Sequence, residues 1–176
     1  GAGGLGQSAI QLARAFGAIT VYAIDINEEK LNLATHYGAI PINAQRVAVV
    51  EEIKKLTKGK GVDVAIEMIG LPQTMKQAVQ SAGVMARVVI VGLSNKPLEI
   101  NTYNDLIGKE LELIGSNDHH LHELPLLIEM ARKKILDTSR IVTRAVPLEA
   151  NAVNATLDAL EKFSGGVRTV IVPASN

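Results

Sequence analysis

Apolar residues follow two alternating patterns along the chain, and together they predict helices separated by strands. In 5–15 and again in 31–37, apolar residues recur at steps of three and four, which is the period of an amphipathic helix. Between these segments lies the β-branched run 19–25, whose short length and apolar character indicate a strand. The same alternation continues to the end of the chain. Strands are predicted at 19–25, 39–43, 62–70, 84–92, 110–116, 141–147 and 167–173, and helices at 5–16, 26–37, 49–56, 75–82, 118–136 and 148–163.

Strands that alternate with helices in this way form βαβ units, which place parallel strands in one sheet with helices on both faces. The segment 84–92 is almost entirely apolar, so we expect it to lie deep in that sheet and to be covered on both faces. The predicted class is α/β, a Rossmann fold with a doubly wound parallel sheet. No strand is predicted ahead of the glycine-rich start, so we expect the fold to lack its first strand because of an N-terminal truncation.

Composition narrows the class of protein further. The 176 residues suffice for one core with an appended piece, and 47% of them are hydrophobic. The 18 Lys and Arg balance the 18 Asp and Glu, so no basic surplus points to nucleic acid or to a membrane surface. The apolar runs are far shorter than the roughly 20 residues of a membrane helix, and no secretory signal is seen, so a cytoplasmic protein is expected. The chain has no cysteine, which excludes disulfides and thiolate-bound zinc within it.

A glycine motif opens the chain. Gly1, Gly3 and Gly6 fit GxGxxG, in which glycines allow a tight turn, the close approach of a pyrophosphate and close packing of the following helix. By itself the motif also fits an ordinary strand-to-helix turn. Asp25 ends the next predicted strand about 20 residues later, where a carboxylate can accept hydrogen bonds from an adenosine ribose. Together these features predict a dinucleotide site whose turn consists of Gly1, Gly3, Gly4, Leu5 and Gly6.

Asp25 also indicates which dinucleotide is bound. A carboxylate at this point repels a 2′-phosphate, and Ile26 after it supplies no cation, so NAD is favoured over NADP. Lys30 lies one helical turn further on, where its side chain either reaches the ribose or is solvated on the helix face.

Over nearly its whole length the chain resembles the medium-chain dehydrogenase/reductase superfamily, in particular the zinc-dependent alcohol dehydrogenase type. The shared segments occur in the family's order and at closely similar spacings. They are GAGGLG, AIDINEEK, VDVAIEMIG, VVIVGL, LIGS and the final GGVRTVIV. The resemblance implies that this chain is the C-terminal, NAD-binding portion of such an enzyme.

The resemblance assigns further residues to the cofactor. Those beside the nicotinamide would be Ile69, Gly70, Val91, Gly92 and Leu93, with Ser116, Asn117 and Asp118 bordering it. Arg168 would meet the pyrophosphate, a task that suits the guanidinium fork, and a surface ion pair is the alternative interpretation.

In the zinc-dependent type, hydride passes from a zinc-bound alkoxide to NAD, and the resemblance places every zinc ligand before the glycine motif. It therefore implies the cofactor-binding part of an NAD-dependent alcohol or polyol dehydrogenase, with zinc in the full-length protein but no catalytic residue or metal ligand here. The chain alone is expected to be inactive. Two alternatives remain open: a zinc-free, NADPH-dependent quinone or enone reductase of the same superfamily, and an inert dinucleotide-binding module. The alcohol or carbonyl substrate is not identified by the sequence.

The resemblance also sets the expected domains and assembly. Residues 1–117 would be the NAD-binding Rossmann domain, and 118–176 would return to pack against a catalytic lobe. Family members associate through the sheet edge near 110–116, so a homodimer or homotetramer is expected.

Two further clusters of polar side chains were weighed as sites. His119, His120 and His122 do not have the spacing of three or four that shares one helix face, so we expect an exposed first turn and no metal. Asp63 and Glu67 share one face of a strand, which could suggest a pair of carboxylates for acid and base catalysis. The resemblance places Glu67 at the edge of the cofactor cleft and implies no role in proton transfer for it.

Overall fold

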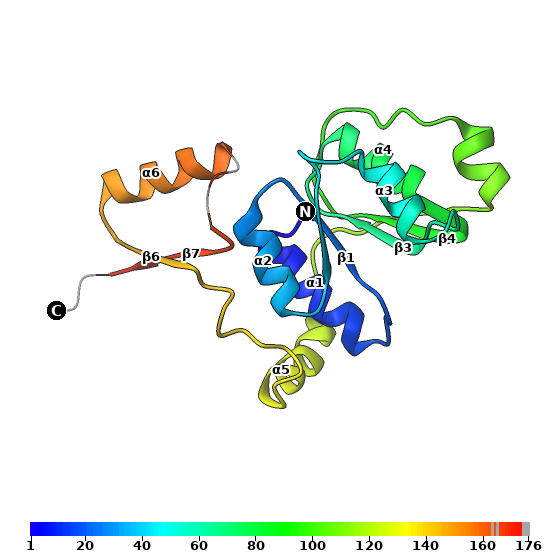
Figure 1. Cartoon of the computed structure of the whole chain (residues 1–176). Coiled ribbons are helices and arrows are strands. Elements are labelled where there is room, and N and C mark those ends of the chain that lie inside the picture. The colour runs from blue at the N-terminus through cyan, green and yellow to red at the C-terminus, as the bar shows by residue number, and fades with distance from the viewer. Residues whose placement is uncertain (163, 165, 174–176) are drawn as a thin grey trace. The chain divides into compact units, whose positions relative to one another are not determined.

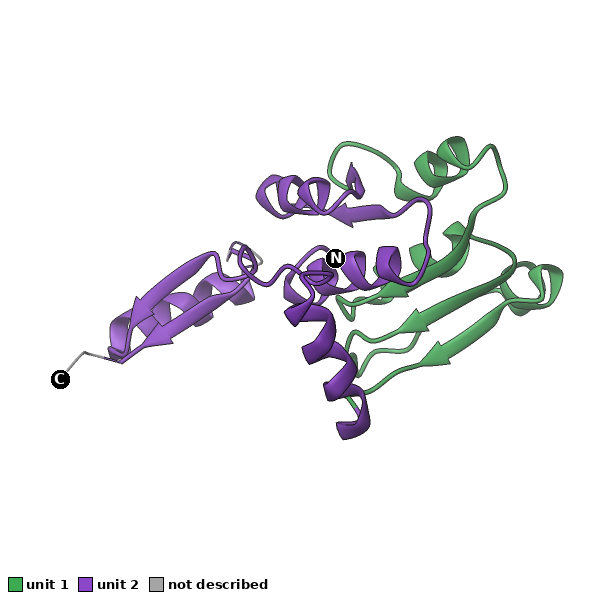
Figure 2. Cartoon of the chain, turned by 90° about the horizontal axis from the view of Figure 1, so that it is seen from below, with its two compact units in different colours: residues 1, 44–119 green, residues 2–43, 120–176 purple. Residues whose placement is uncertain are grey.

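The structure, a computed structural model, describes residues 1–162, 164 and 166–173 and divides into two compact units. Unit 1 comprises residue 1 and 44–119, and unit 2 comprises 2–43 and 120–176 (Figure 2). Helices and strands alternate along the chain (Figure 1). Every strand pair among the described residues is parallel, which confirms the predicted α/β class. None of the helices in the described part is long and apolar enough to cross a membrane.

The N-terminal part of unit 2 forms a small layered structure of two helices and two parallel strands. Its elements are α1 (Gly4–Ala15), β1 (Tyr22–Asp25), α2 (Glu28–His36) and β2 (Ile40–Asn43). Asn27 begins α2, because its side-chain oxygen accepts hydrogen bonds from the backbone nitrogens of Glu29 and Lys30. Ile10 of α1, Ala23 of β1 and Leu31 of α2 are buried in one core, so the predicted periodicities are confirmed here. The carboxyl end of β1 thus comes to lie beside the glycine turn.

The C-terminal part of unit 2 adds a second parallel pair. Its elements are a 3₁₀ turn η3 (Leu121–Glu123), α5 (Leu124–Arg132), β6 (Arg144–Pro147), α6 (Ala150–Glu161) and β7 (Thr169–Val172). The segment after α5 is held to α1, since the Gln11 amide bonds both the backbone nitrogen of Asp137 at 2.6 Å and its carbonyl at 3.2 Å. The predicted helix 148–163 is confirmed as α6, and its last residue, Phe163, lies outside the described residues.

Unit 1 is built on a three-stranded parallel sheet in the order β3-β4-β5. Its elements are α3 (Val49–Leu56), β3 (Val62–Glu67), α4 (Pro72–Ser81), β4 (Ala82–Ile90), the short helices η1 (Thr102–Leu106) and η2 (Ile107–Lys109), and β5 (Glu112–Gly115). Val79 of α4 packs with Ala86 and Val88 of β4 in a second core. The ammonium of Lys109 caps the end of α4 by donating to the carbonyls of Val79, Gln80 and Ala82.

The segment 84–92 is central in this sheet, as predicted, but the expectation that it is covered along its whole length is wrong. Ala86 and Val88 are buried, whereas Val84 and Met85 are 70% and 74% exposed. Met85 has a φ of +57°, and the pairing with β3 shifts register nearby, so the strand is irregular at its start. An apolar run shows that a strand is suited to burial, but its neighbours decide how much of it is covered.

The helix predicted at 118–136 begins later than expected. Asp118 has a φ of +55° and does not cap it, and α5 starts at Leu124 with Pro125 in its first turn. Proline lacks an N–H and restricts the residue before it, which favours the first turn of a helix over its interior. The basic end of the helix is also shorter, because Lys134 follows the helix with a φ of +58°.

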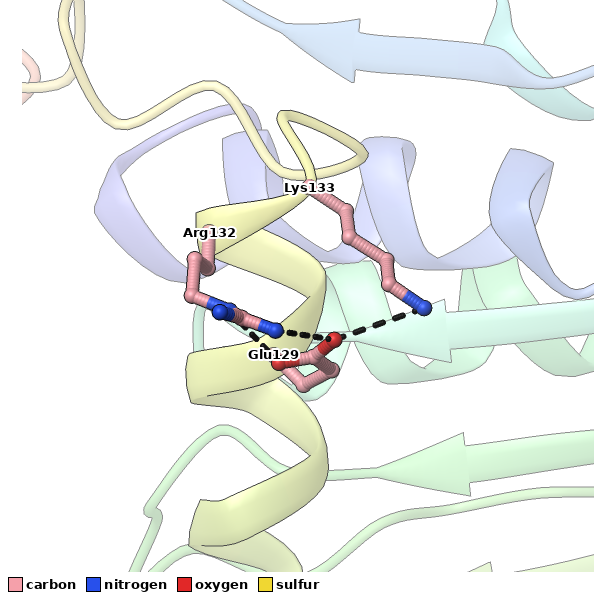
Figure 3. A network of polar contacts seen from close by, with 3 residues as sticks. All are labelled: Glu129, Arg132 and Lys133. Carbon is pink, nitrogen blue, oxygen red and sulfur yellow. Dashed lines mark hydrogen bonds and ion pairs between the residues drawn. The ribbon is translucent and has the colours of Figure 1, made fainter.

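Ion pairs cover the last turn of α5 (Figure 3). The Glu129 carboxylate accepts from Arg132 at 2.9 and 3.0 Å, and Lys133 lies 3.3 Å away. Hydrogen bonds from Arg132, and then from Lys133, hold the pKa of the Glu129 carboxyl below its ordinary value. All three groups are largely solvated, so we assign this network a small role in stability and none in function.

Candidate functional site

The glycine turn leaves the amino end of α1 open. Gly3 is the capping residue, no side chain caps the helix, and no acidic residue lies in its first turn. A side chain at Gly3 would meet nothing within 4 Å, so there is space in front of the turn. The first backbone N–H groups of a helix have no partner within the helix and carry partial positive charge. The amino end of α1 is therefore suited to an anion.

Arg168 adds a second positive group at the same place. Its Nη2 lies 3.0 Å from the point that a Cβ on Gly4 would occupy, so the guanidinium rests against the turn. The backbone holds Arg168 there, because its carbonyl accepts from the nitrogen of Thr143 at 2.9 Å where β7 begins beside β6. A cation close to the positive end of a helix is unfavourable unless an anion lies with them.

Asp25 is held against the turn by three backbone donors. Its Oδ2 accepts from the nitrogen of Ala2 at 2.7 Å, and its Oδ1 accepts from those of Ile26 and Asn27 at 2.8 and 3.0 Å. The carboxylate is thus oriented without a cationic partner in this set of bonds. Ile26 beside it is 46% exposed and carries no charge.

Gln7 is a residue of this turn that sequence reasoning missed. It is fully buried, and its Nε2 donates to the carbonyls of Ala2 at 2.7 Å and Lys30 at 2.8 Å. One amide therefore ties the glycine turn to the first turn of α2, where Lys30 is half-buried. Its Oε1 is buried without a hydrogen-bond partner among the described residues. The available signal was a polar residue on the apolar side of the predicted helix, directly after Gly6.

The other predicted residues of the turn differ in their surroundings. Gly6 is buried in α1, whereas Leu5 is 60% exposed. In unit 1, a Cβ on Gly1 would lie 2.7 Å from Cγ1 of Ile69, so the glycine permits that contact.

The remaining predicted residues of unit 1 lie in the loops at the carboxyl ends of its strands. Ile69 and Gly70 follow β3, residues 91–93 follow β4, and Ser116 and Asn117 follow β5, so all come after the carboxyl ends of parallel strands. Ser116 continues the ladder by donating to the carbonyl of Ile90 at 3.0 Å. An open hollow of about 490 Å³ lies there, lined by Gly70, Leu71, Leu93, Ser94, Asn95 and Lys96. Ligands of open α/β sheets bind at this edge.

Two glycines let the loops after β3 and β4 touch. Gly70 has a φ of +87°, and a Cβ there would collide with the carbonyl oxygen of Leu93. A Cβ on Gly92 would collide with the nitrogen of Gly70. Both positions therefore require glycine for the packing of the chain itself.

Glu67 underlies both loops, which its sequence position alone did not reveal. Its side chain is 4% exposed. The carboxylate accepts from the nitrogens of Ile69 and Gly70 at 2.8 and 3.1 Å and from the Thr74 hydroxyl at 2.8 Å. Asp63, on the same strand, is exposed, so the two acids do not form a buried pair.

The histidines do not form the first turn of α5. His120 and His122 have stacked rings 5.4 Å apart, and His119 pairs with Asp118 at 2.6 Å. All three histidines are exposed, and the described part of the chain contains no cluster of three His, Asp or Glu that could hold a metal.

Each unit thus brings one set of predicted residues together. Unit 2 gathers the open turn, Asp25 and Arg168, and unit 1 gathers the loops after its strands. Lys30 contributes to the first set through its backbone carbonyl, which binds Gln7.

Known proteins are similar to this chain in sequence and in fold. A family model described as zinc-binding dehydrogenase matches residues 4–133. The L-threonine 3-dehydrogenase of Symbiobacterium thermophilum is 32% identical over 98% of the chain and 49% of its own length. The (R,R)-butanediol dehydrogenase of Bacillus subtilis is 30% identical over 98% of the chain and 49% of its own length.

Solved structures agree with the sequence comparison. The alcohol dehydrogenase of the archaeon Aeropyrum pernix matches with a TM-score of 0.86 and 32% identity, covering 98% of this chain and 48% of its own. The chain spans about half the length of the relatives it matches. By sequence and by fold, the chain belongs to the zinc-binding dehydrogenase family, and it corresponds to the C-terminal part of the zinc-dependent medium-chain alcohol dehydrogenases.

Proposed function

We propose that the chain binds NAD(H) as the cofactor-binding part of an NAD-dependent alcohol or polyol dehydrogenase. One observation carries the proposal: the Arg168 guanidinium and the uncapped amino end of α1 meet at an open glycine turn, next to the fixed carboxylate of Asp25. The two positive groups suit a pyrophosphate, and the carboxylate suits the hydroxyls of a ribose.

The residues present fit the parts of this cofactor by charge, and the turn at Gly3 leaves space for its pyrophosphate. In this proposal Gly1, Gly3, Gly4, Leu5, Gly6 and Arg168 hold the pyrophosphate, Asp25, Ile26 and Lys30 hold the adenosine ribose, and Ile69, Gly70, Val91, Gly92, Leu93, Ser116 and Asn117 hold the nicotinamide. When bound, NAD supplies a hydride acceptor. The contribution of this chain is to bind and orient it.

Asp25 favours NAD over NADP in this proposal. Its two oxygens already accept three backbone bonds, so the carboxylate cannot turn away from a 2′-phosphate without losing them. The exposed Ile26 offers no compensating cation. A phosphate at this position would face a fixed negative charge.

The described residues do not fit zinc. The chain has no cysteine, and its described part has no cluster of metal-binding side chains. We therefore assign no step to a metal here. Alcohol oxidation by the whole protein is a proposal suggested by relatives named as threonine, butanediol and alcohol dehydrogenases. Zinc binding by the whole protein is a proposal suggested by the description of the matching family, and a cytoplasmic place stays a prediction from the sequence.

Calorimetric titration of the chain with NADH and with NADPH tests the proposal. We expect NADH to bind at least about tenfold more tightly, which corresponds to about 1.4 kcal/mol. Asp25→Ser is expected to reduce this preference, and Asp63→Asn, an exposed acid of β3, is the matched control. Tighter binding of NADPH by the unchanged chain would contradict the proposal and favour the NADPH-dependent reductases. Binding of neither would overturn it.

A further inference from the structure

Glu67 is the one buried acid of the candidate site, and the proposed function gives it no contact with the cofactor. It is 4% exposed and ends β3, directly before the loop that contains Ile69 and Gly70. A buried carboxylate is costly unless donors surround it. The donors around the Glu67 carboxylate therefore indicate its role.

The carboxylate organises the loop after β3. The nitrogens of Ile69 and Gly70 donate to it, and so does the Thr74 hydroxyl in the first turn of α4. These bonds fix the turn at Gly70, where φ is +87°. They also place a negative charge at the amino end of α4, which stabilises that helix.

Glu67 also contacts the loop after β4. Its main-chain carbonyl accepts from the nitrogens of Val91 and Gly92 at 2.8 and 3.1 Å. A Cβ on Gly92 would lie 2.7 Å from its Oε2, so the carboxylate packs against that glycine. Because Gly70 in turn lies against the carbonyl of Leu93, a shift of one loop displaces the other.

We propose that Glu67 is a positioning residue, which locks the loops after β3 and β4 into one rigid support for the nicotinamide half of the cofactor. This inference rests on the proposed function, which assigns Gly70, Gly92 and Leu93 to the nicotinamide. The adenosine half is assigned to Asp25 and Arg168, whose contacts do not involve Glu67. Loss of the carboxylate should therefore weaken one half of the binding and spare the other.

The test compares two ligands on Glu67→Gln, which keeps the size of the side chain but removes its charge and places an amide donor beside the nitrogen of Gly70. NADH carries the nicotinamide, and ADP-ribose carries the same adenosine and pyrophosphate without it. We expect the Kd for NADH to rise about tenfold and that for ADP-ribose to change less than about twofold. Asp63→Asn, an acid of the same strand that is exposed, should change neither.

Thr74 supplies a second, milder variant in case Glu67→Gln does not fold. Thr74→Val removes one of the donors to the carboxylate, whereas Thr74→Ser keeps it. We expect Thr74→Val to raise the ratio of the Kd for NADH to the Kd for ADP-ribose, and Thr74→Ser to leave that ratio as it is in the unchanged chain. A purely structural role would weaken NADH and ADP-ribose alike, and that result overturns the inference, as does an unchanged ratio.

Amide hydrogen exchange without ligand separates this inference from the proposed function. In Glu67→Gln, or in Thr74→Val, exchange should accelerate together in peptides covering 67–71 and 90–94, compared with Asp63→Asn. Acceleration in the first peptide alone would refute the coupling of the loops. If the unchanged chain binds neither ligand, the proposed function fails, while coupled exchange would still establish the lock.

Discussion

Several residues of the candidate site are fixed by contacts within the protein before any ligand is considered. Gly70 and Gly92 allow two loops to touch, and Gln7 joins the glycine turn to α2 through one amide. Glu67 is surrounded by donors from its own loop and from α4. Such residues are positioned by packing, and they in turn hold the groups that face a ligand.

Replacement of Gly70 tests this at one residue. Gly70→Ala places a side chain at a φ of +87° and against the Leu93 carbonyl, so we expect a loss of about 2 kcal/mol or more in the free energy of unfolding. Urea denaturation measures it. Gly3→Ala is the control, since a Cβ there meets nothing within 4 Å, and an equal loss in both variants would contradict the contact.

Tyr37 gives a prediction for alkaline pH. Its hydroxyl donates to the Asp137 carbonyl at 3.2 Å. Burial, followed by the Asp137 carboxylate, raises the pKa of Tyr37 above the ordinary 10.0, and Arg140 lowers it in part. A folded-state pKa above the unfolded value gives stability that is fully present below pH 10.0 and is lost as pH rises through the folded-state pKa.

Tyr37→Phe isolates this contribution. We expect the unchanged chain to be the more stable of the two below pH 10.0, and the difference to shrink above it. Urea titrations at a series of pH values measure the difference directly. The variant must be compared with the unchanged chain at each pH, because Lys109 also changes the stability in this range. Burial lowers the pKa of Lys109, so its contribution to the free energy of unfolding grows as the pH rises. A gap that widens with pH would show that the pKa is not raised.

At the scale of elements, helices α1 and α4 differ at their amino ends. Glu67 places a carboxylate at the start of α4 through Thr74. The start of α1 has no acid in its first turn, and Arg168 lies against it. The start of α4 therefore has a carboxylate of the protein beside it, whereas the start of α1 is suited to an anion from outside.

Arg168→Gln tests the role of this element. We expect NADH and ADP-ribose to bind about tenfold more weakly, because both carry the pyrophosphate that the guanidinium would pair with. The affinity should also depend less on salt than in the unchanged chain. Lys162→Gln, which changes an exposed cation of the same unit, serves as the control. Unchanged affinity for both ligands would contradict a role of Arg168 at the pyrophosphate.

At the scale of the whole molecule, unit 1 ends its sheet at β5, where Leu113 and Ile114 are 41% and 38% exposed. The strand pairs with β4 on one side only among the described residues. Such an edge is suited to pairing with another copy. We therefore predict that the chain forms a homodimer or homotetramer through β5.

Sedimentation velocity of Leu113→Lys tests that expectation. We expect the unchanged chain to associate with increasing concentration and the variant to stay monomeric, because a charge on an edge strand opposes pairing. Leu160→Lys, an exposed apolar residue of α6, is the control. Association that persists in Leu113→Lys would place the interface elsewhere.

The isolated chain is also expected to show no alcohol oxidation. It spans about half the length of its dehydrogenase relatives, and we propose that the catalytic groups lie in the other half. An assay of purified chain with NAD and simple alcohols should show no NADH absorbance above the rate of a blank. Turnover by pure material would refute the division of labour proposed here.

The sequence determined the class of fold and the order of its elements, because helix and strand periods, caps and glycine stops act over a few neighbouring residues. Only the tertiary structure decided that Asp25 bonds Ala2, that Arg168 reaches Gly4 and that Glu67 joins two loops. It also decided that the start of 84–92 is exposed and that α5 begins at Leu124 and not at Asp118. These contacts join residues far apart in the chain, and no local pattern of polar and apolar positions encodes which distant backbone will lie beside a given side chain.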